Sequence, residues 1–319
     1  MNGRTQIAHR AVHVAVLAAI AIAAFFVYRS LGRYSWAEIA EAVQAIPLAR
    51  LGSALVFVAA SYLCLSGFDT LAVRYAGKPL PWRQAGLASF CALSIGHNVG
   101  MAALSSGAVR YRFYSRFGLS GGEIAKVIGF CGITVGLGLA ALAAIVLLLD
   151  LGPDTDLFGI DAGTRIAAGL GCLAVPTGYL LICALRLPVR LRQWRIEPPG
   201  IGLAALQVGI GTLNFACVAA AIHQLVAVFG PISYFEVAGA YVTANIASLI
   251  SHVPGGLGVL EATMLGILPG KEIIGALVAF RVLYFFVPLA IGLPTFLLSE
   301  AYYRHRPSCR LERRAAERS

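Results

Sequence analysis

The chain has 319 residues, of which 59% are hydrophobic and only 13% charged, with a net charge of +10 and a mean hydropathy of +0.79. This composition predicts a multi-pass membrane protein and leaves no room for a soluble catalytic domain. Because the Lys and Arg residues occur in short clusters between apolar runs, they indicate cytoplasmic loops facing anionic headgroups rather than nucleic-acid binding.

Six apolar stretches are long enough to cross a bilayer, since about 20 apolar residues span the hydrocarbon core as a helix. They cover about residues 11–31, 52–73, 124–149, 166–185, 201–229 and 273–298. The first is too long for a signal-peptide core and lacks a small-residue cleavage site, so we interpret it as a spanning helix. We therefore predict one all-α membrane domain over residues 11–299, with tails at residues 1–10 and 300–319.

Between the second and third spans, an apolar leg at residues 85–104 leads into a polar return at residues 105–118. The leg is long enough to span a membrane, but the return is too polar to cross lipid. This segment is therefore predicted to be a re-entrant hairpin.

A second interrupted segment, residues 234–269, lies between the fifth and sixth spans. Four residues that weaken helices lie near its centre: Pro254, Gly255, Gly256 and Gly258. Any backbone that they free at membrane depth must be buried in protein or face a water-filled cavity. They are predicted to shape a second re-entrant hairpin.

Short motifs recur along the chain at a nearly constant spacing of 149 to 155 residues. Residues 79–82, 94–97 and 121–124 match residues 231–234, 249–252 and 270–273. We predict two repeats, about residues 11–150 and 165–299, each with three spans and one hairpin. Because three is an odd number, the two repeats must be inverted in the membrane, as they are in many secondary transporters.

The distribution of basic residues along the chain also predicts that the two repeats are inverted, and it gives their orientation in the membrane. Basic residues occur in the first ten residues, in the loops around 74–83, 110–126 and 186–195, and in the tail. The positive-inside rule places these segments in the cytoplasm and the acidic loop at residues 150–161 outside. We therefore expect a bacterial inner-membrane protein with both termini in the cytoplasm and hairpins that enter from opposite faces.

Four stretches form a recognisable set: PGGLGVLEA at residues 254–262, NIASLISH at 245–252, RVLYFFVP at 281–288 and GAVRYRFYSRFGLS at 107–120. Together they resemble the transmembrane region of bifunctional lysyl-phosphatidylglycerol synthase/flippases. The chain is similar also to stand-alone membrane proteins that share this region. It departs from the bifunctional members in lacking the aminoacyl-transferase domain after the bundle, so we do not expect lysyl transfer by this chain alone. The resemblance implies lipid translocation by the bundle, with membrane lipids as partners.

Charged residues inside the apolar segments are costly unless they are paired or hydrated, so they are candidates for function. Glu261 and Arg281 are interpreted either as a structural ion pair or as a cavity site for a lipid headgroup. Arg110 and Arg112 are suited to a lipid phosphate by their planar guanidinium groups, or they are ordinary anchors at the cytoplasmic boundary.

Uncharged polar residues on the two hairpins complete the candidate cavity: His97, Asn98, Asn245 and His252. His97 and His252 occupy matching places in the two repeats. The alternative is that each His satisfies the broken backbone of its own hairpin. No spacing of Cys, His, Asp or Glu indicates a metal site, a disulfide or a cofactor, and none is predicted.

Three functions follow from these features. The first is a lipid translocase, in which a headgroup passes through a cavity between inverted repeats. The second is a membrane scaffold that binds or stabilises a lipid-synthesising partner enzyme. The third, an integral-membrane transferase, lacks the carboxylate cluster or nucleophile that its chemistry requires. No oligomeric state follows from the sequence.

Overall fold

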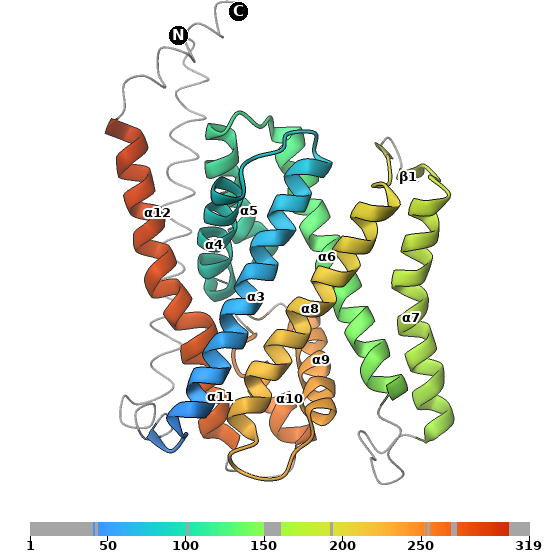
Figure 1. Cartoon of the computed structure of the whole chain (residues 1–319), viewed down its shortest axis with the longest axis vertical. Coiled ribbons are helices and arrows are strands. Elements are labelled where there is room, and N and C mark those ends of the chain that lie inside the picture. Colours follow the sequence, from blue (N-terminus) through green and yellow to red (C-terminus); the bar gives the residue numbers. More distant parts are fainter. Residues whose placement is uncertain are drawn as a thin grey trace, which may run out of the picture.

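A computed structural model of the protein describes residues 41, 44–99, 102–149, 161–191, 194–251, 253, 256–268 and 273–305. The described part is a bundle of helices, as predicted, with one short β-hairpin (Figure 1). Among the described residues, five segments are long and apolar enough to cross a membrane: α3 (Leu48–Tyr75), α6 (Gly121–Leu149), α7 (Ala162–Ala184), α8 (Ile201–Val226) and the segment Ile273–Tyr303. They match the last five predicted spans, while the first, residues 11–31, lies outside the described residues. The chain is a multi-pass membrane protein.

Two helices begin with a capping box, in which a Ser and a Glu three residues later bond to each other's backbone N–H. Before α6, the Ser120 N–H donates to Glu123 Oε2 at 2.7 Å, and the Glu123 N–H donates to Ser120 Oγ at 3.4 Å. Ser233 and Glu236 make the same reciprocal pair at the start of α9 (Tyr234–Ser251), at 2.6 and 3.2 Å. These capping boxes satisfy backbone donors that a helix start leaves free.

Two helical hairpins occupy the positions where interrupted segments were predicted. The first joins α4 (Trp82–Val99) to α5 (Ala102–Arg116), and the second joins α9 to α10 (Val259–Ile267). In Figure 1 the first hairpin lies in the upper half of the bundle and the second in the lower half. The two halves also share one order of elements, since α3 precedes the first hairpin and α8 the second. That the halves are inverted repeats stays a prediction.

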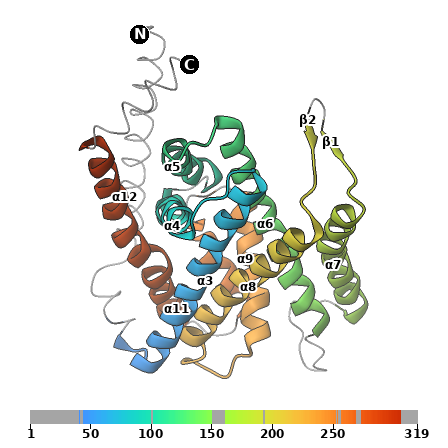
Figure 2. The same cartoon turned by 45° about the horizontal axis from the view of Figure 1, so that its top comes forward.

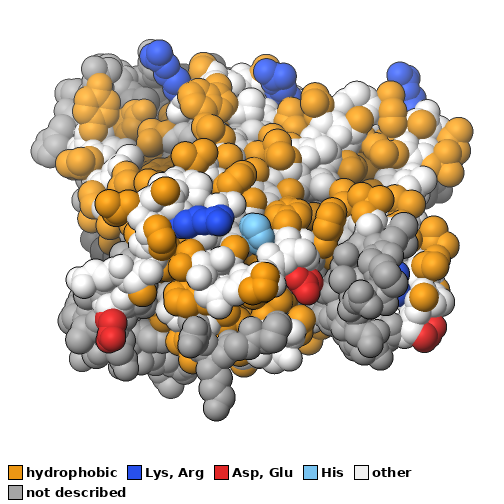
Figure 3. Space-filling view, turned by 60° about the horizontal axis from the view of Figure 1, so that its bottom comes forward, with side chains coloured by type: hydrophobic (Ala, Val, Ile, Leu, Met, Phe, Trp, Pro, Cys, Tyr) orange, Lys and Arg blue, Asp and Glu red, His pale blue; other side chains and the backbone are white. Residues whose placement is uncertain are grey.

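Helices α3 and α8 pack side by side near the centre of the molecule and run in opposite directions (Figures 1 and 2). Helix α6 packs so closely against α8 that a Cβ atom on Gly138 would lie only 2.3 Å from the carbonyl carbon of Gly211. Small residues of this kind let the backbones of membrane helices approach one another. The face that comes forward in Figure 3, which includes the lower end of the bundle, carries many hydrophobic side chains and few charged ones.

The sequence did not predict two local features. The basic loop after α7 contains an antiparallel ribbon, β1 (Val189–Leu191) with β2 (Trp194–Ile196). The last membrane-crossing segment is divided into α11 (Ile273–Arg281), a π-helical turn η2 (Val282–Phe286) and α12 (Val287–His305). Both features lie in segments that hydropathy alone assigns as a plain loop and a plain helix.

Candidate functional site

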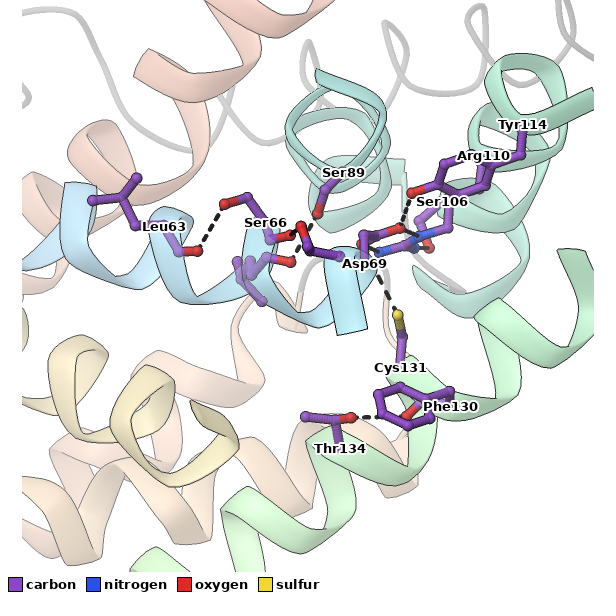
Figure 4. A network of polar contacts seen from close by, with 12 residues as sticks. Leu63, Ser66, Asp69, Ser89, Ser106, Arg110, Tyr114, Phe130, Cys131 and Thr134 are labelled. Atoms are coloured by element: carbon purple, nitrogen blue, oxygen red, sulfur yellow. Dashed lines mark hydrogen bonds and ion pairs between the residues drawn. The ribbon is translucent and has the colours of Figure 1, made fainter. Parts of the chain in front are cut away.

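Asp69 and Arg110 form a buried ion pair that joins α3 to α5 (Figure 4). Arg110 donates from Nε to Asp69 Oδ1 and from Nη2 to Asp69 Oδ2, each at 2.8 Å. The Tyr114 hydroxyl donates to Oδ1 at 2.6 Å, and Cys131 Sγ lies 3.9 Å from Oδ2. The exposed fraction is 0% for the Asp69 side chain and 4% for Arg110. The carboxylate therefore has hydrogen-bonding partners on both of its oxygens inside the protein.

The sequence left two interpretations of Arg110 open, a ligand for a lipid phosphate and an anchor at the cytoplasmic boundary. The arrangement of its hydrogen bonds decides against the second. The third nitrogen of its guanidinium, Nη1, donates to Ser106 Oγ at 3.0 Å, so all three nitrogens have partners. Arg110 is therefore not an exposed anchor at the membrane boundary. Asp69 was missed as a site residue, although a carboxylate inside a predicted span is itself a signal of function.

Glu261 and Arg281 form the second intramembrane pair, beside the second hairpin. Arg281 Nη2 donates to Glu261 Oε2 at 2.9 Å, and Arg281 Nε bonds Oε1 of the same carboxylate. The exposed fraction is 3% for Arg281 and 12% for Glu261. The Arg281 guanidinium also lies over the Phe285 ring, 5.2 Å from its centroid. The pair joins α10 of the second hairpin to the end of α11.

Two glycines in the second hairpin form a turn whose backbone contacts the pair between Glu261 and Arg281. Gly256 has a φ of 59° and Gly258 a φ of 81°, a backbone conformation that costs other residues free energy. The turn lets the Gly256 carbonyl accept a hydrogen bond from Arg281 Nη2 at 3.1 Å. It also lets the Gly258 N–H donate to Glu261 Oε2 at 2.9 Å. The backbone of the two glycines thus holds both charged side chains in position through hydrogen bonds.

The first hairpin contacts the π-helical turn of the last segment. Pro288 cannot donate to the carbonyl of Tyr284, because it has no N–H and its ring opposes that carbonyl. The Tyr62 hydroxyl donates to the Tyr284 carbonyl at 3.1 Å, and Asn98 Nδ2 donates to the Phe285 carbonyl at 3.2 Å. Side chains from α3 and α4 therefore donate to two carbonyls of the π-turn, one of which Pro288 leaves without its helical donor.

The remaining predicted residues take several places. The His97 ring stacks on Tyr284, with centroids 5.9 Å apart, and its Nδ1 has no hydrogen-bond partner among the described residues. Asn245 Nδ2 donates to the Tyr241 hydroxyl at 3.2 Å within α9. Arg112 pairs with Glu300 of α12 at 2.9 Å. His252, Pro254 and Gly255 lie outside the described residues.

Within the described part of the chain, no group of three or more His, Cys, Asp or Glu side chains could hold a metal ion. The site consists instead of two buried carboxylate–guanidinium pairs, one on each hairpin. Such pairs can exchange partners with an ion of either sign, because each contains a group of each charge.

The family model described as the lysylphosphatidylglycerol synthase TM region matches residues 16–292 of the chain. The chain is 31% identical over 264 residues to the protein slr0712 of Synechocystis sp., covering 81% of this chain and 82% of that protein. It is 32% identical over 277 residues to the inner membrane protein YbhN of Escherichia coli, covering 84% of this chain and 86% of YbhN.

Proposed function

Because the chain belongs to the lysylphosphatidylglycerol synthase TM region family, we propose that it is a lipid translocase of the bacterial inner membrane. It moves a polar lipid between leaflets by passing the headgroup between its two hairpins. The observation that carries this proposal is the buried ion pair on each hairpin, Asp69 with Arg110 and Glu261 with Arg281.

Each ion pair holds a hairpin against a membrane-crossing helix. Opening a hairpin separates the two charges and leaves each without its partner, which costs about 3 to 5 kcal/mol in buried settings. A phospholipid headgroup lowers this cost because its phosphate pairs with the guanidinium, and the ammonium of a zwitterionic headgroup pairs with the carboxylate. Opening is therefore coupled to the presence of a headgroup.

Contacts between α3 and α8 support a mechanism in which the two halves exchange conformations. Ser61 Oγ donates to Asn214 Oδ1 at 2.7 Å. One turn further on, the thiols of Cys64 and Cys217 are near enough to interact electrostatically. Both pairs are separated by 153 residues, the spacing of the sequence repeat. A residue that meets its own repeat equivalent lies on the axis relating the two halves, so this contact between α3 and α8 is the pivot in the proposal.

The test uses purified protein in liposomes that contain a headgroup-labelled phospholipid, with dithionite added outside to bleach the outer leaflet. The proposal predicts a second, slower phase of bleaching that protein-free vesicles lack. The variants Glu261→Gln and Arg281→Gln should slow this phase, whereas Arg83→Gln, which removes a charge from an exposed side chain, should not.

A result without transfer for any headgroup would favour the alternative of a scaffold for a lipid-synthesising enzyme. In that case the buried pairs are structural only. Their replacement by apolar side chains of similar volume would then leave the fold and the association with the partner enzyme intact.

A further inference from the structure

A further group of charged side chains joins the C-terminal part of α5 to that of α12. Arg112 donates from Nε to both oxygens of Glu300 at 3.1 Å, and from Nη2 to Oε2 at 2.9 Å. Arg116 Nη2 forms an ion pair with Oε1 of the same carboxylate. The Arg116 guanidinium also lies over the ring of Tyr303, 5.3 Å from its centroid. We name Arg112, Arg116, Glu300 and Tyr303 the boundary cluster.

The boundary cluster retains a net positive charge, because two guanidinium groups share one carboxylate. Its charged side chains are only 12 to 18% exposed, so water screens this charge poorly. Arg116 Nη1 is buried and has no hydrogen-bond partner among the described residues. A buried charged donor of this kind is costly to leave unsatisfied. The cluster thus offers a charge and a hydrogen-bond donor to an anion.

The surroundings of the boundary cluster indicate the depth of the lipid headgroups. Both α5 and α12 end on the upper side of the bundle in Figure 2. Tyr302 and Tyr303 lie at this end of α12, and Tyr residues are enriched where a membrane meets water. One to three turns earlier, α12 exposes the apolar side chains of Ile291, Leu297 and Leu298. An acyl chain along this surface would bring its headgroup to the cluster.

We propose that the boundary cluster binds the phosphate of an anionic phospholipid, with Arg116 as the principal ligand and Glu300 as the residue that positions both arginines. A planar guanidinium matches phosphate oxygens in a fork that an ammonium cannot reproduce. The single surplus positive charge matches the single negative charge of a phosphodiester. This site rests on the proposed function only for its role, as the place where a lipid docks before translocation; the binding itself stands apart from transport.

The binding test measures retained lipid by native mass spectrometry on protein purified from nanodiscs. The nanodiscs contain phosphatidylglycerol and phosphatidylcholine in equal amounts with identical acyl chains. Wild-type protein should retain phosphatidylglycerol preferentially, and Arg116→Ala should lower this preference about tenfold, the effect of about 1.4 kcal/mol. Arg116→Lys keeps the charge without the fork and should give an intermediate loss. Arg74→Ala removes an exposed arginine at the end of α3 and should retain the wild-type preference.

Inorganic phosphate in excess separates the two sources of a phosphate group. Lipid binding predicts that inorganic phosphate does not displace phosphatidylglycerol, because the acyl chains contribute to retention. Displacement would instead identify a site for soluble phosphate and overturn the lipid assignment. Equal retention by wild type and Arg116→Ala would overturn the proposal, as would an equal loss in Arg74→Ala. If Arg116→Ala does not fold, Arg116→Lys and Arg116→Gln carry the same comparison.

A transport assay on the same proteins separates this proposal from the proposed function. A preference for phosphatidylglycerol that depends on Arg116, in protein that moves no lipid, would keep the binding site and remove translocation. Transport without that preference would keep translocation and remove the site.

Discussion

Removing one partner of the pair between Asp69 and Arg110 should destabilise the protein far more than removing both. The variants Asp69→Leu and Arg110→Met each leave one charge in a site whose side chains are 0% and 4% exposed. The expected loss is about 3 to 5 kcal/mol for each, because the remaining charge is buried without compensation. The double variant replaces both charges with apolar groups of similar volume, so we expect a change of only about 0 to 2 kcal/mol.

The assay is reversible unfolding in SDS, followed by circular dichroism on protein in mixed micelles. Arg74→Met serves as the control, because this side chain is exposed and its replacement should change the free energy of unfolding by no more than about 0.5 kcal/mol. Additive losses in the double variant, near the sum of the two single variants, would refute the reasoning. They would mean that each charge is stabilised separately and that the bonds between them contribute little.

Exchanging Glu261 for Arg and Arg281 for Glu should restore folding relative to either single change, measured by monodisperse elution in gel filtration, while lipid transfer stays reduced because the headgroup meets reversed charges. The variant Gly258→Ala should lose about 1 to 2 kcal/mol in the SDS assay, since its φ of 81° disfavours a Cβ. Bridging the thiols of Cys64 and Cys217 with Hg(II), in protein whose other cysteines are replaced by serine, should leave lipid transfer within about twofold of the unbridged rate, because helices at a pivot move little.

Each of these outcomes has an opposite that counts against the account. Full transfer in the exchanged variant would make the pair between Glu261 and Arg281 purely structural. Unchanged stability in Gly258→Ala would show that the turn does not need a left-handed residue. Loss of transfer on bridging, reversed by a thiol, would show that the pivot does not lie at the contact between α3 and α8.

The membrane-crossing segments could be predicted from sequence because hydropathy is a property of each segment alone. The same is true of the hairpin at Gly256 and Gly258, whose residue types disfavour a continuous helix. The contact between Glu261 and Arg281 was predictable because each charge needs a partner at membrane depth and both lie beside the same broken segment.

The partner of Asp69 was harder to predict, because Arg110 lies 41 residues away in a segment that reads as a basic cytoplasmic stretch. Which of several arginines enters the bundle depends on how α5 packs, and hydropathy does not report packing. The π-turn before Pro288 was missed for a related reason. The sequence shows the missing donor, but only the packed structure shows that the Tyr62 hydroxyl donates to the freed Tyr284 carbonyl.

The measurement that tests the central claim most directly follows unlabelled lipids extracted from the native membrane. The protein is reconstituted into liposomes of these lipids, and a membrane-impermeant reagent modifies the headgroups of the outer leaflet, with and without a proton gradient. The account predicts that the modified fraction rises beyond the outer leaflet's share for at least one lipid class in the presence of wild-type protein. It also predicts that the rise slows in folded Glu261→Gln. A modified fraction that stays at the outer leaflet's share for every class, as in protein-free vesicles, would contradict it.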